Sequence, residues 1–161
     1  MNAEYNLILL SPLGRSGSHF IHGLFDSKQE ILCFPCLFNF YATWTKYDII
    51  NPGRKNAAEL IDYFLKNSYL KIFFNKNDAN ALFSFLDDEN HGRKVGIDVK
   101  AYRNLILDEI SKKGIEFPNR KQMLILFHTA YARIMDIPLE NKKIILLNEH
   151  VGIPYFDLNE V

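Results

Sequence analysis

The stretch Leu7-Ile8-Leu9-Leu10-Ser11-Pro12-Leu13-Gly14-Arg15-Ser16-Gly17-Ser18-His19-Phe20 decides the fold. Its first part, Leu7–Leu10, is a continuous apolar run, which is typical of a strand buried on both faces of a parallel sheet. Apolar residues then recur on one side of a helix with 3.6 residues per turn. The stretch therefore predicts a strand, a Gly/Ser/Arg loop and a helix. The apolar residues on that side of the helix are Phe20, Ile21, Leu24 and Phe25.

The loop between this strand and this helix is a predicted anion site. Backbone N–H groups at a helix N-terminus lack intrahelical partners, and together with the helix dipole they favour a phosphate-like anion. The loop adds glycines that permit close approach, hydroxyl donors, and a fixed positive charge on Arg15. The residues that we expect to hold the anion are Gly14, Arg15, Ser16, Gly17, Ser18 and His19. The alternative is an ordinary turn that joins a strand to a helix.

The spacing of this loop differs from that of a Walker A loop, which needs a lysine directly after its second glycine. Here Ser18 follows Gly17, and the cation precedes the Ser-Gly pair. Pro12–Ser18 instead resembles the 5′-phosphosulfate loop of the PAPS-dependent sulfotransferase family, which runs strand, a proline, [RK]-S-G-[ST], helix, and Arg15–Ser18 matches its last four positions. Asp26 and the segment Ile31–Pro35 also look like that family's next segment. His19 stands where the family more often has Thr or Ser.

The resemblance implies a function and a fold. We expect the chain to move a sulfuryl group from 3′-phosphoadenosine-5′-phosphosulfate (PAPS) to a hydroxyl or amine of a carbohydrate or small molecule, with PAP as product. The implied fold class is α/β, with a P-loop-like parallel sheet flanked by helices and a helical insertion. Arg15 would stabilise charge on the bridging oxygen, and no metal is required. Two alternatives stay open: a non-catalytic adenosine-phosphate-binding module, and a P-loop-like nucleotide kinase.

Composition sets the broad class. The chain has 161 residues, of which 48% are hydrophobic, so we expect one globular domain over residues 1–161. Nineteen basic residues balance nineteen acidic ones, which gives no support for a nucleic-acid-binding surface. The N-terminus lacks a basic region and a long apolar run, so we expect neither a signal peptide nor a membrane span, and a cytoplasmic location.

The pair Cys33-Phe34-Pro35-Cys36 has three interpretations. It could be a redox pair, or it could form a zinc site with His19 and His22. Against the zinc site, bound phosphate would compete with the metal for His19. Against the redox pair, the strand, loop and helix that precede the cysteines are already explained by anion binding. Free cysteines are among the most buried residues, so we favour structural thiols.

The middle of the chain is predicted to be mostly helical. The aromatic stretch Phe38–Trp44 looks irregular, and its rings belong in the core more often than in an acceptor pocket. Cap residues and apolar spacing predict the elements beyond it. These are a turn at Asn51-Pro52-Gly53, a helix capped by Asn56 that buries Ala57, Leu60, Ile61, Phe64 and Leu65, a helix capped by Asp78, a short strand over Lys94–Val99, a helix ended by Gly114, and a helix capped by Asn119.

The segment Lys142–His150 predicts a buried strand that delivers polar residues at its carboxyl end, where ligands gather in open α/β sheets. Cytosolic sulfotransferases have a similar strand that ends in K-T-H, whose histidine is the general base. His150 stands in that place, although the lysine of the pattern is missing. Some carbohydrate and tyrosyl sulfotransferases use a glutamate after the first helix instead, where this chain has Cys36. We therefore expect Arg15 and His150 to be catalytic, with Glu149 as the alternative base.

The family's 3′-phosphate motif normally lies after the segment that ends at Val161. The resemblance therefore covers the N-terminal portion of the family fold, and we expect the fold to be incomplete on its C-terminal side. On this basis the 161-residue chain alone should bind PAPS weakly and turn it over slowly.

Overall fold

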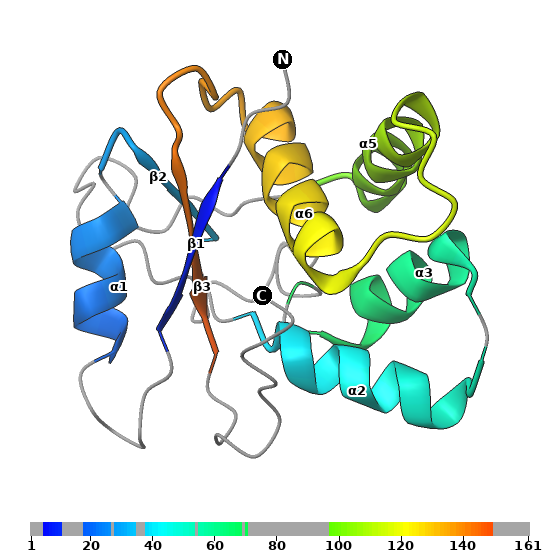
Figure 1. Cartoon of the computed structure of the whole chain (residues 1–161). Coiled ribbons are helices and arrows are strands. Elements are labelled where there is room, and N and C mark those ends of the chain that lie inside the picture. Colours follow the sequence, from blue (N-terminus) through cyan, green and yellow to red (C-terminus); the bar gives the residue numbers. More distant parts are fainter. Residues whose placement is uncertain are drawn as a thin grey trace.

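Three parallel strands form the sheet at the centre of the molecule (Figure 1). The computed structural model describes residues 5–10, 18–26, 28–34, 38–53, 55–68, 70 and 97–149. Strands β1 (Asn6–Leu10), β3 (Ile144–Asn148) and β2 (Ile31–Cys33) lie side by side in that order. The last strand in the sequence thus lies between the first two, and the predicted parallel sheet is confirmed.

Five helices flank this sheet within the described residues, and they divide unequally between its faces. Helix α1 (Ser18–Asp26) lies on one face, and α2, α3, α5 and α6 lie together on the other (Figure 1). The bounds of these four are Phe40–Ile50, Ala57–Asn67, Val99–Lys112 and Arg120–Ile134. All four fall between β2 and β3 in the sequence, so the expected helical insertion is confirmed for the described residues.

Capping residues set the ends of the inserted helices much as their sequence signals predict. The Asn56 side chain accepts a hydrogen bond from the Glu59 N–H at 3.1 Å and begins α3. Asn119 and Gln122 form a reciprocal capping box at the start of α6. Gly114 follows α5 with a φ of 62°, a left-handed conformation that glycine adopts without strain. The predicted strand over Lys94–Val99 is wrong where it is described, because Asp98 caps α5 and Val99 is its first residue.

The prediction that Phe38–Trp44 is irregular is wrong from Phe40 onward, where α2 begins. Its N-cap residue, Asn39, makes no side-chain cap hydrogen bond, so the usual local signal is missing. The backbone N–H groups of the first turn are satisfied from the far end of the sequence, by Glu149. The helix start therefore depends on a tertiary contact that local sequence does not reveal.

The orientation of α1 differs from the pattern of its apolar residues. His22 and Gly23 face the sheet and are buried, whereas Phe20 and Leu24 are 66% and 42% exposed. The hydrogen bonds of His22 hold this orientation, as described below. In β1, Ile8 is also 41% exposed and Leu7, Leu9 and Leu10 are only half-buried, so the expectation of a strand buried on both faces is wrong.

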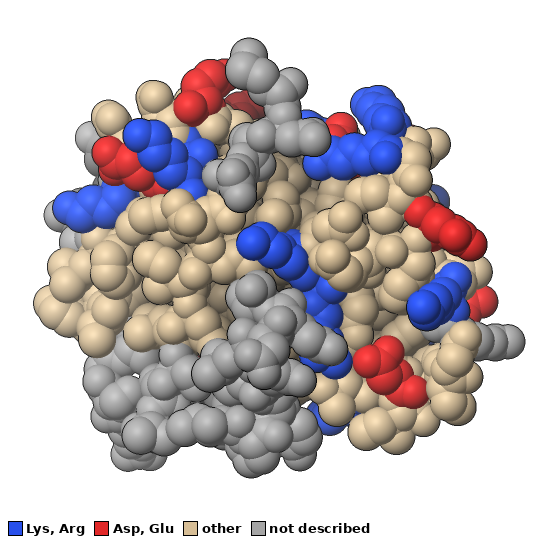
Figure 2. Space-filling model, in the orientation of Figure 1, with Lys and Arg blue, Asp and Glu red and all other residues tan. Residues whose placement is uncertain are grey.

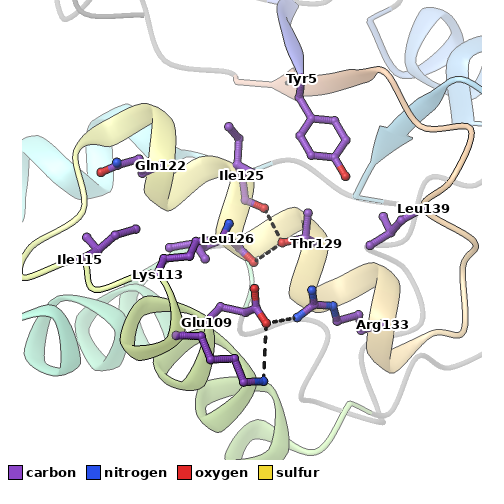
Figure 3. A pocket seen from close by; sticks show the side chains of 11 residues that line it. Tyr5, Glu109, Lys113, Ile115, Gln122, Ile125, Leu126, Thr129, Arg133 and Leu139 are labelled. Carbon is purple, nitrogen blue, oxygen red and sulfur yellow. Dashed lines mark hydrogen bonds and ion pairs between the residues drawn. The ribbon is translucent and has the colours of Figure 1, made fainter. Parts of the chain in front are cut away.

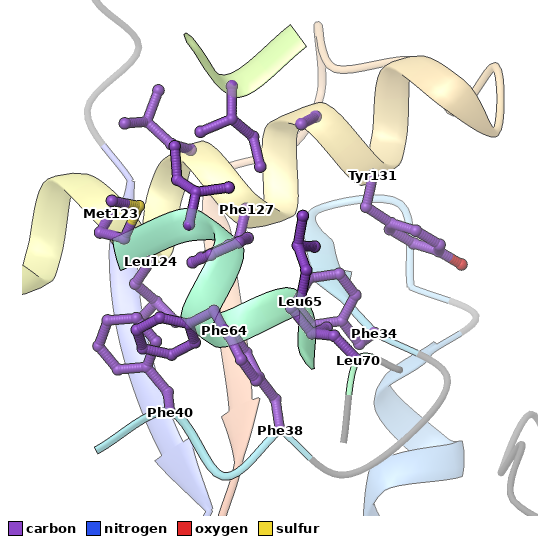
Figure 4. Close-up of a cluster of buried hydrophobic side chains, with 14 of the residues drawn as sticks. Phe34, Phe38, Phe40, Phe64, Leu65, Leu70, Met123, Leu124, Phe127 and Tyr131 are labelled. Carbon is purple, nitrogen blue, oxygen red and sulfur yellow. The ribbon is translucent and has the colours of Figure 1, made fainter. Parts of the chain in front are cut away.

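An aromatic cluster fills the space between the sheet and the helices of the insertion (Figure 4). Phe38 lies at its centre, with its ring centroid 5.1 Å from that of Phe34 and 5.6 Å from that of Phe127, both edge to face. Phe64 joins it from α3 and packs 5.1 Å from Phe127. Edge-to-face pairs add to the stabilisation from burial. The expectation that Phe38, Tyr41 and Trp44 belong to the core is confirmed, since all three are buried.

Basic and acidic side chains are interspersed on the face of the molecule drawn in Figure 2, in keeping with the balanced composition. Among the residues that the structure describes, no helix has both the length and the hydropathy needed to cross a membrane. The predicted helix capped by Asp78 lies outside the described residues.

Replacing Phe64 tests the aromatic cluster. Phe64→Ala should lower the free energy of unfolding by about 3–5 kcal/mol, because it removes a fully buried ring and leaves a cavity. Phe20→Ala is the matched control on an exposed ring and should change it by less than about 0.5 kcal/mol. Urea titration followed by circular dichroism measures both, and equal effects would contradict this account of the core.

Candidate functional site

The carboxyl ends of β1 and β3 lie next to each other. Leu10 and Asn148 are register partners, and the backbone N–H of Glu149 donates to the Leu10 carbonyl oxygen at 3.0 Å. Leu10 is the last residue before the predicted anion loop, and Glu149 directly precedes His150. The pairing therefore brings the two stretches singled out in the sequence to one edge of the sheet.

The predicted site residues themselves are described only in part. Gly14, Arg15, Ser16, Gly17 and His150 lie outside the described residues. Ser18 and His19 are the first two residues of α1, and their side chains are not described. The strand before the loop and the helix after it are both where the sequence predicts them. The contacts within the loop, and with His150, stay predictions.

His22 ties α1 to the carboxyl ends of β2 and β3. Its Nε2 atom donates to the Phe34 carbonyl oxygen at 2.7 Å, and Asn148 Nδ2 donates to His22 Nδ1 at 2.9 Å. A carbonyl only accepts, so Nε2 carries the proton and Nδ1 is the acceptor. These bonds are buried and hold the helix that follows the predicted anion loop. The sequence pattern did not predict this role of His22. The one feature that could have indicated it is a polar residue within an otherwise apolar helix.

The same geometry bears on the zinc interpretation of the cysteines. Both ring nitrogens of His22 are engaged in hydrogen bonds, so neither offers a lone pair to a metal. Cys33 is buried in β2 beside Ile31 and Leu146, which suits a structural thiol. Cys36 lies outside the described residues. Across the described ranges, no group of three or more His, Cys, Asp or Glu side chains could hold a metal ion.

The carboxylate of Glu149 lies at the N-terminus of α2. Its Oε2 atom accepts from the Tyr41 N–H and its Oε1 atom from the Ala42 N–H, both at 3.1 Å. An acceptor at this end of a helix satisfies unpaired N–H groups and interacts favourably with the dipole. The side chain is fully buried, and this burial raises the pKa of Glu149 to about 7, although the N–H donors act in the opposite direction. Both oxygens are committed to the helix, which favours a capping role for Glu149 over that of a base.

A second buried histidine lies beneath this edge of the sheet. His128 Nδ1 donates to the Leu124 carbonyl oxygen at 2.9 Å, and the imidazole packs on Phe34 with ring centroids 4.1 Å apart. Burial lowers the pKa of His128 to about 4, so the ring is neutral near pH 7. The uncharged His128 ring therefore lies buried against Phe34, the residue directly after β2.

Comparisons of this chain with protein-family models, with characterised proteins and with solved structures find no significant match.

The burial of Glu149 predicts a pH dependence of stability. Because its folded-state pKa of about 7 exceeds the ordinary value of 4.5, the folded state binds more protons than the unfolded state between these pH values. The contribution of Glu149 to stability is therefore present at low pH and is lost as pH rises towards 7. As pH rises from 4.5 to 7, the free energy of unfolding of the wild type should fall by about 3 kcal/mol relative to that of Glu149→Gln.

Urea titrations at several pH values measure this difference, with Glu116→Gln as a control on an exposed glutamate. The control should follow the wild type at every pH. Parallel pH profiles for the wild type and Glu149→Gln would show that the carboxyl group is not held as described.

Proposed function

We propose that this protein is a PAPS-dependent sulfotransferase that moves a sulfuryl group from PAPS to a hydroxyl or amine of a carbohydrate or small molecule. The proposal rests on the resemblance of Pro12–Ser18 to the family's 5′-phosphosulfate loop. One structural observation supports it most: the hydrogen bond from the Glu149 N–H to the Leu10 carbonyl oxygen, at 3.0 Å. This bond joins the strand that leads into the loop to the strand that leads to His150.

The secondary structure around the loop also supports the proposal. β1 ends at Leu10 and α1 begins at Ser18, so the loop connects the carboxyl end of a parallel strand to a helix N-terminus. Backbone N–H groups and the helix dipole favour a phosphate at such a position. We infer that the three strands are part of a P-loop-like sheet, with its ligand outside the carboxyl ends of the strands.

The proposed chemistry divides between Arg15 and His150. An oxygen or nitrogen of the acceptor attacks the sulfur of PAPS in line, and the bond from sulfur to the phosphate oxygen breaks. Arg15 stabilises the negative charge that develops on that oxygen as PAP leaves. His150 takes the proton that the acceptor loses. As in phosphoryl transfer, the chain contributes mainly by positioning and charge stabilisation.

The geometry of Glu149 favours His150 as the base. A base must reach the proton that it removes, whereas both carboxylate oxygens of Glu149 are hydrogen-bonded to the backbone of α2. Glu149 instead anchors the chain immediately before His150. Two alternatives make different predictions for the experiments below. The first is a module that binds an adenosine phosphate without catalysing a reaction. The second is a nucleotide kinase, although the sequence has no Walker lysine after Gly17.

Calorimetry with PAP and with Mg-ATP tests the donor site. PAP should bind, although weakly, and Arg15→Ala should weaken that binding by about tenfold to a hundredfold, because a charged hydrogen-bond donor is lost. Arg103→Ala is a control that removes a half-buried guanidinium, paired with Asp62, from α5 and should leave PAP binding unchanged. Preferential binding and turnover of Mg-ATP would favour the kinase, and PAP affinity that is equal in the wild type and Arg15→Ala would contradict the donor site.

A transfer assay with labelled PAPS tests the base. His150→Ala should lower turnover by about 10²–10⁴-fold and leave PAP affinity unchanged, because general-base help acts on the acceptor. His128→Gln is a control on a histidine that we assign to the core. The turnover of this variant should fall only in proportion to the fraction of the protein that is unfolded. Equal turnover of the wild type and His150→Ala would reject His150 as the base. PAP binding without transfer to any acceptor would favour the non-catalytic module.

A further inference from the structure

A pocket of about 620 Å³ lies at the amino end of β1, beside Tyr5 (Figure 3). Helices α5 and α6 form its walls, and Tyr5 and Leu139, which come before β1 and β3, close it. The strands are parallel, so residues that precede them lie at the amino edge of the sheet. β1 spans five residues, or about 16 Å, between this edge and the carboxyl edge. The pocket is therefore separate from the site of the proposed sulfuryl transfer.

Charged side chains line one part of this pocket. Arg133 of α6 forms an ion pair with Glu109 of α5, with 2.6 Å between Nη1 and Oε1, and Lys112 Nζ lies 3.8 Å from the same carboxylate oxygen. Lys113 adds a third cation to the lining. Among the described residues of the lining, these three cations outnumber the single carboxylate three to one, and the Arg133 side chain stays 41% exposed. An anion can approach this part of the pocket.

Helix dipoles reduce this excess of positive charge but do not cancel it. Both α5 and α6 end at this pocket, where Lys112 and Arg133 lie in their last turns. Each helix C-terminus carries the equivalent of about half a negative charge. These two termini weaken the positive potential of the three cations, which favours a singly charged anion over a doubly charged one.

Apolar side chains line the rest of the pocket. Leu126 and Tyr5 are buried, and Ile125, Leu139 and Ile115 are half-buried around them. In Figure 3, Tyr5 and Leu139 lie on the side of the pocket away from Glu109. Pockets for small molecules of drug size have volumes of about 300–1,000 Å³, a mostly apolar lining and a few polar groups that orient the ligand.

We propose that this pocket binds a small organic monoanion, with its charged head beside Lys112, Lys113 and Arg133 and its apolar body against Ile125, Leu126 and Leu139. The hydroxyl of Thr129 donates to the Ile125 carbonyl oxygen at 2.9 Å, so its proton is already engaged and the anionic head is placed at the three cations instead. The ligand class is thus an aromatic or acyl carboxylate, or a molecule of equivalent shape and charge. Nothing in this assignment depends on the proposed transferase activity.

An NMR titration with 2-naphthoate tests the site in the full chain. We expect saturable shifts of the backbone amides of Tyr5, Thr129 and Leu139. Two further probes separate the contributions: 2-naphthylmethanol has the same body without the charge, and inorganic phosphate has charge without the body. Both should bind at least about tenfold more weakly than 2-naphthoate, since each lacks one of the two interactions.

The double variant Lys112→Gln/Lys113→Gln should weaken 2-naphthoate binding by about tenfold. Its matched control is Lys100→Gln/Lys121→Gln, which removes the same charge from exposed positions of α5 and α6 outside the pocket and should bind as the wild type does. Equal weakening in both double variants, equal affinity for the uncharged probe, or no saturable shift at the three reporter amides would each overturn the proposal.

Discussion

The structure depends on the insertion of β3 between β1 and β2. This parallel pairing brings the last described residues of the chain, Asn148 and Glu149, beside the carboxyl ends of the first two strands. Parallel strands require long connections, and here four helices of the insertion fill the connection between β2 and β3. Their aromatic side chains pack on one face of the sheet and make burial of β3 favourable. The carboxyl edge of the sheet is thereby assembled from the first two strands and the last one.

Buried polar groups hold this edge together. Glu149 connects the end of β3 to the start of α2, and His22 connects α1 to the ends of both β2 and β3. Removing such groups from water is costly, and the cost is offset only when their hydrogen bonds are made. The partners of Glu149 and His22 come from different elements, so these bonds form only when the helices and strands are correctly assembled. The bonds of His22 fix how α1 lies against the sheet, and those of Glu149 fix where α2 begins.

The two ends of the sheet have different chemical character. The carboxyl end has the buried, hydrogen-bonded His22, the start of α2 capped by Glu149, and the strand that leads into the predicted anion loop. The amino end has a pocket in which Lys112, Lys113 and Arg133 meet an apolar lining. Since β1 separates these ends by about 16 Å, a ligand at one end makes no direct contact with a ligand at the other. The proposed donor site and the proposed organic-anion pocket can therefore be tested independently of each other.

Local sequence by itself determined most of the elements: the apolar run of β1, the caps at Asn56 and Asn119, and the end of α5 near Gly114 depend on neighbours a few residues away. The tertiary structure alone decided which side of α1 faces the sheet, because the bonds of His22 reach Phe34 and Asn148. It also decided that α2 begins at Phe40, because its cap is the distant Glu149. The reason is physical: spacing and capping act within one or two turns, whereas the partner of a buried polar group is set by how the whole chain packs.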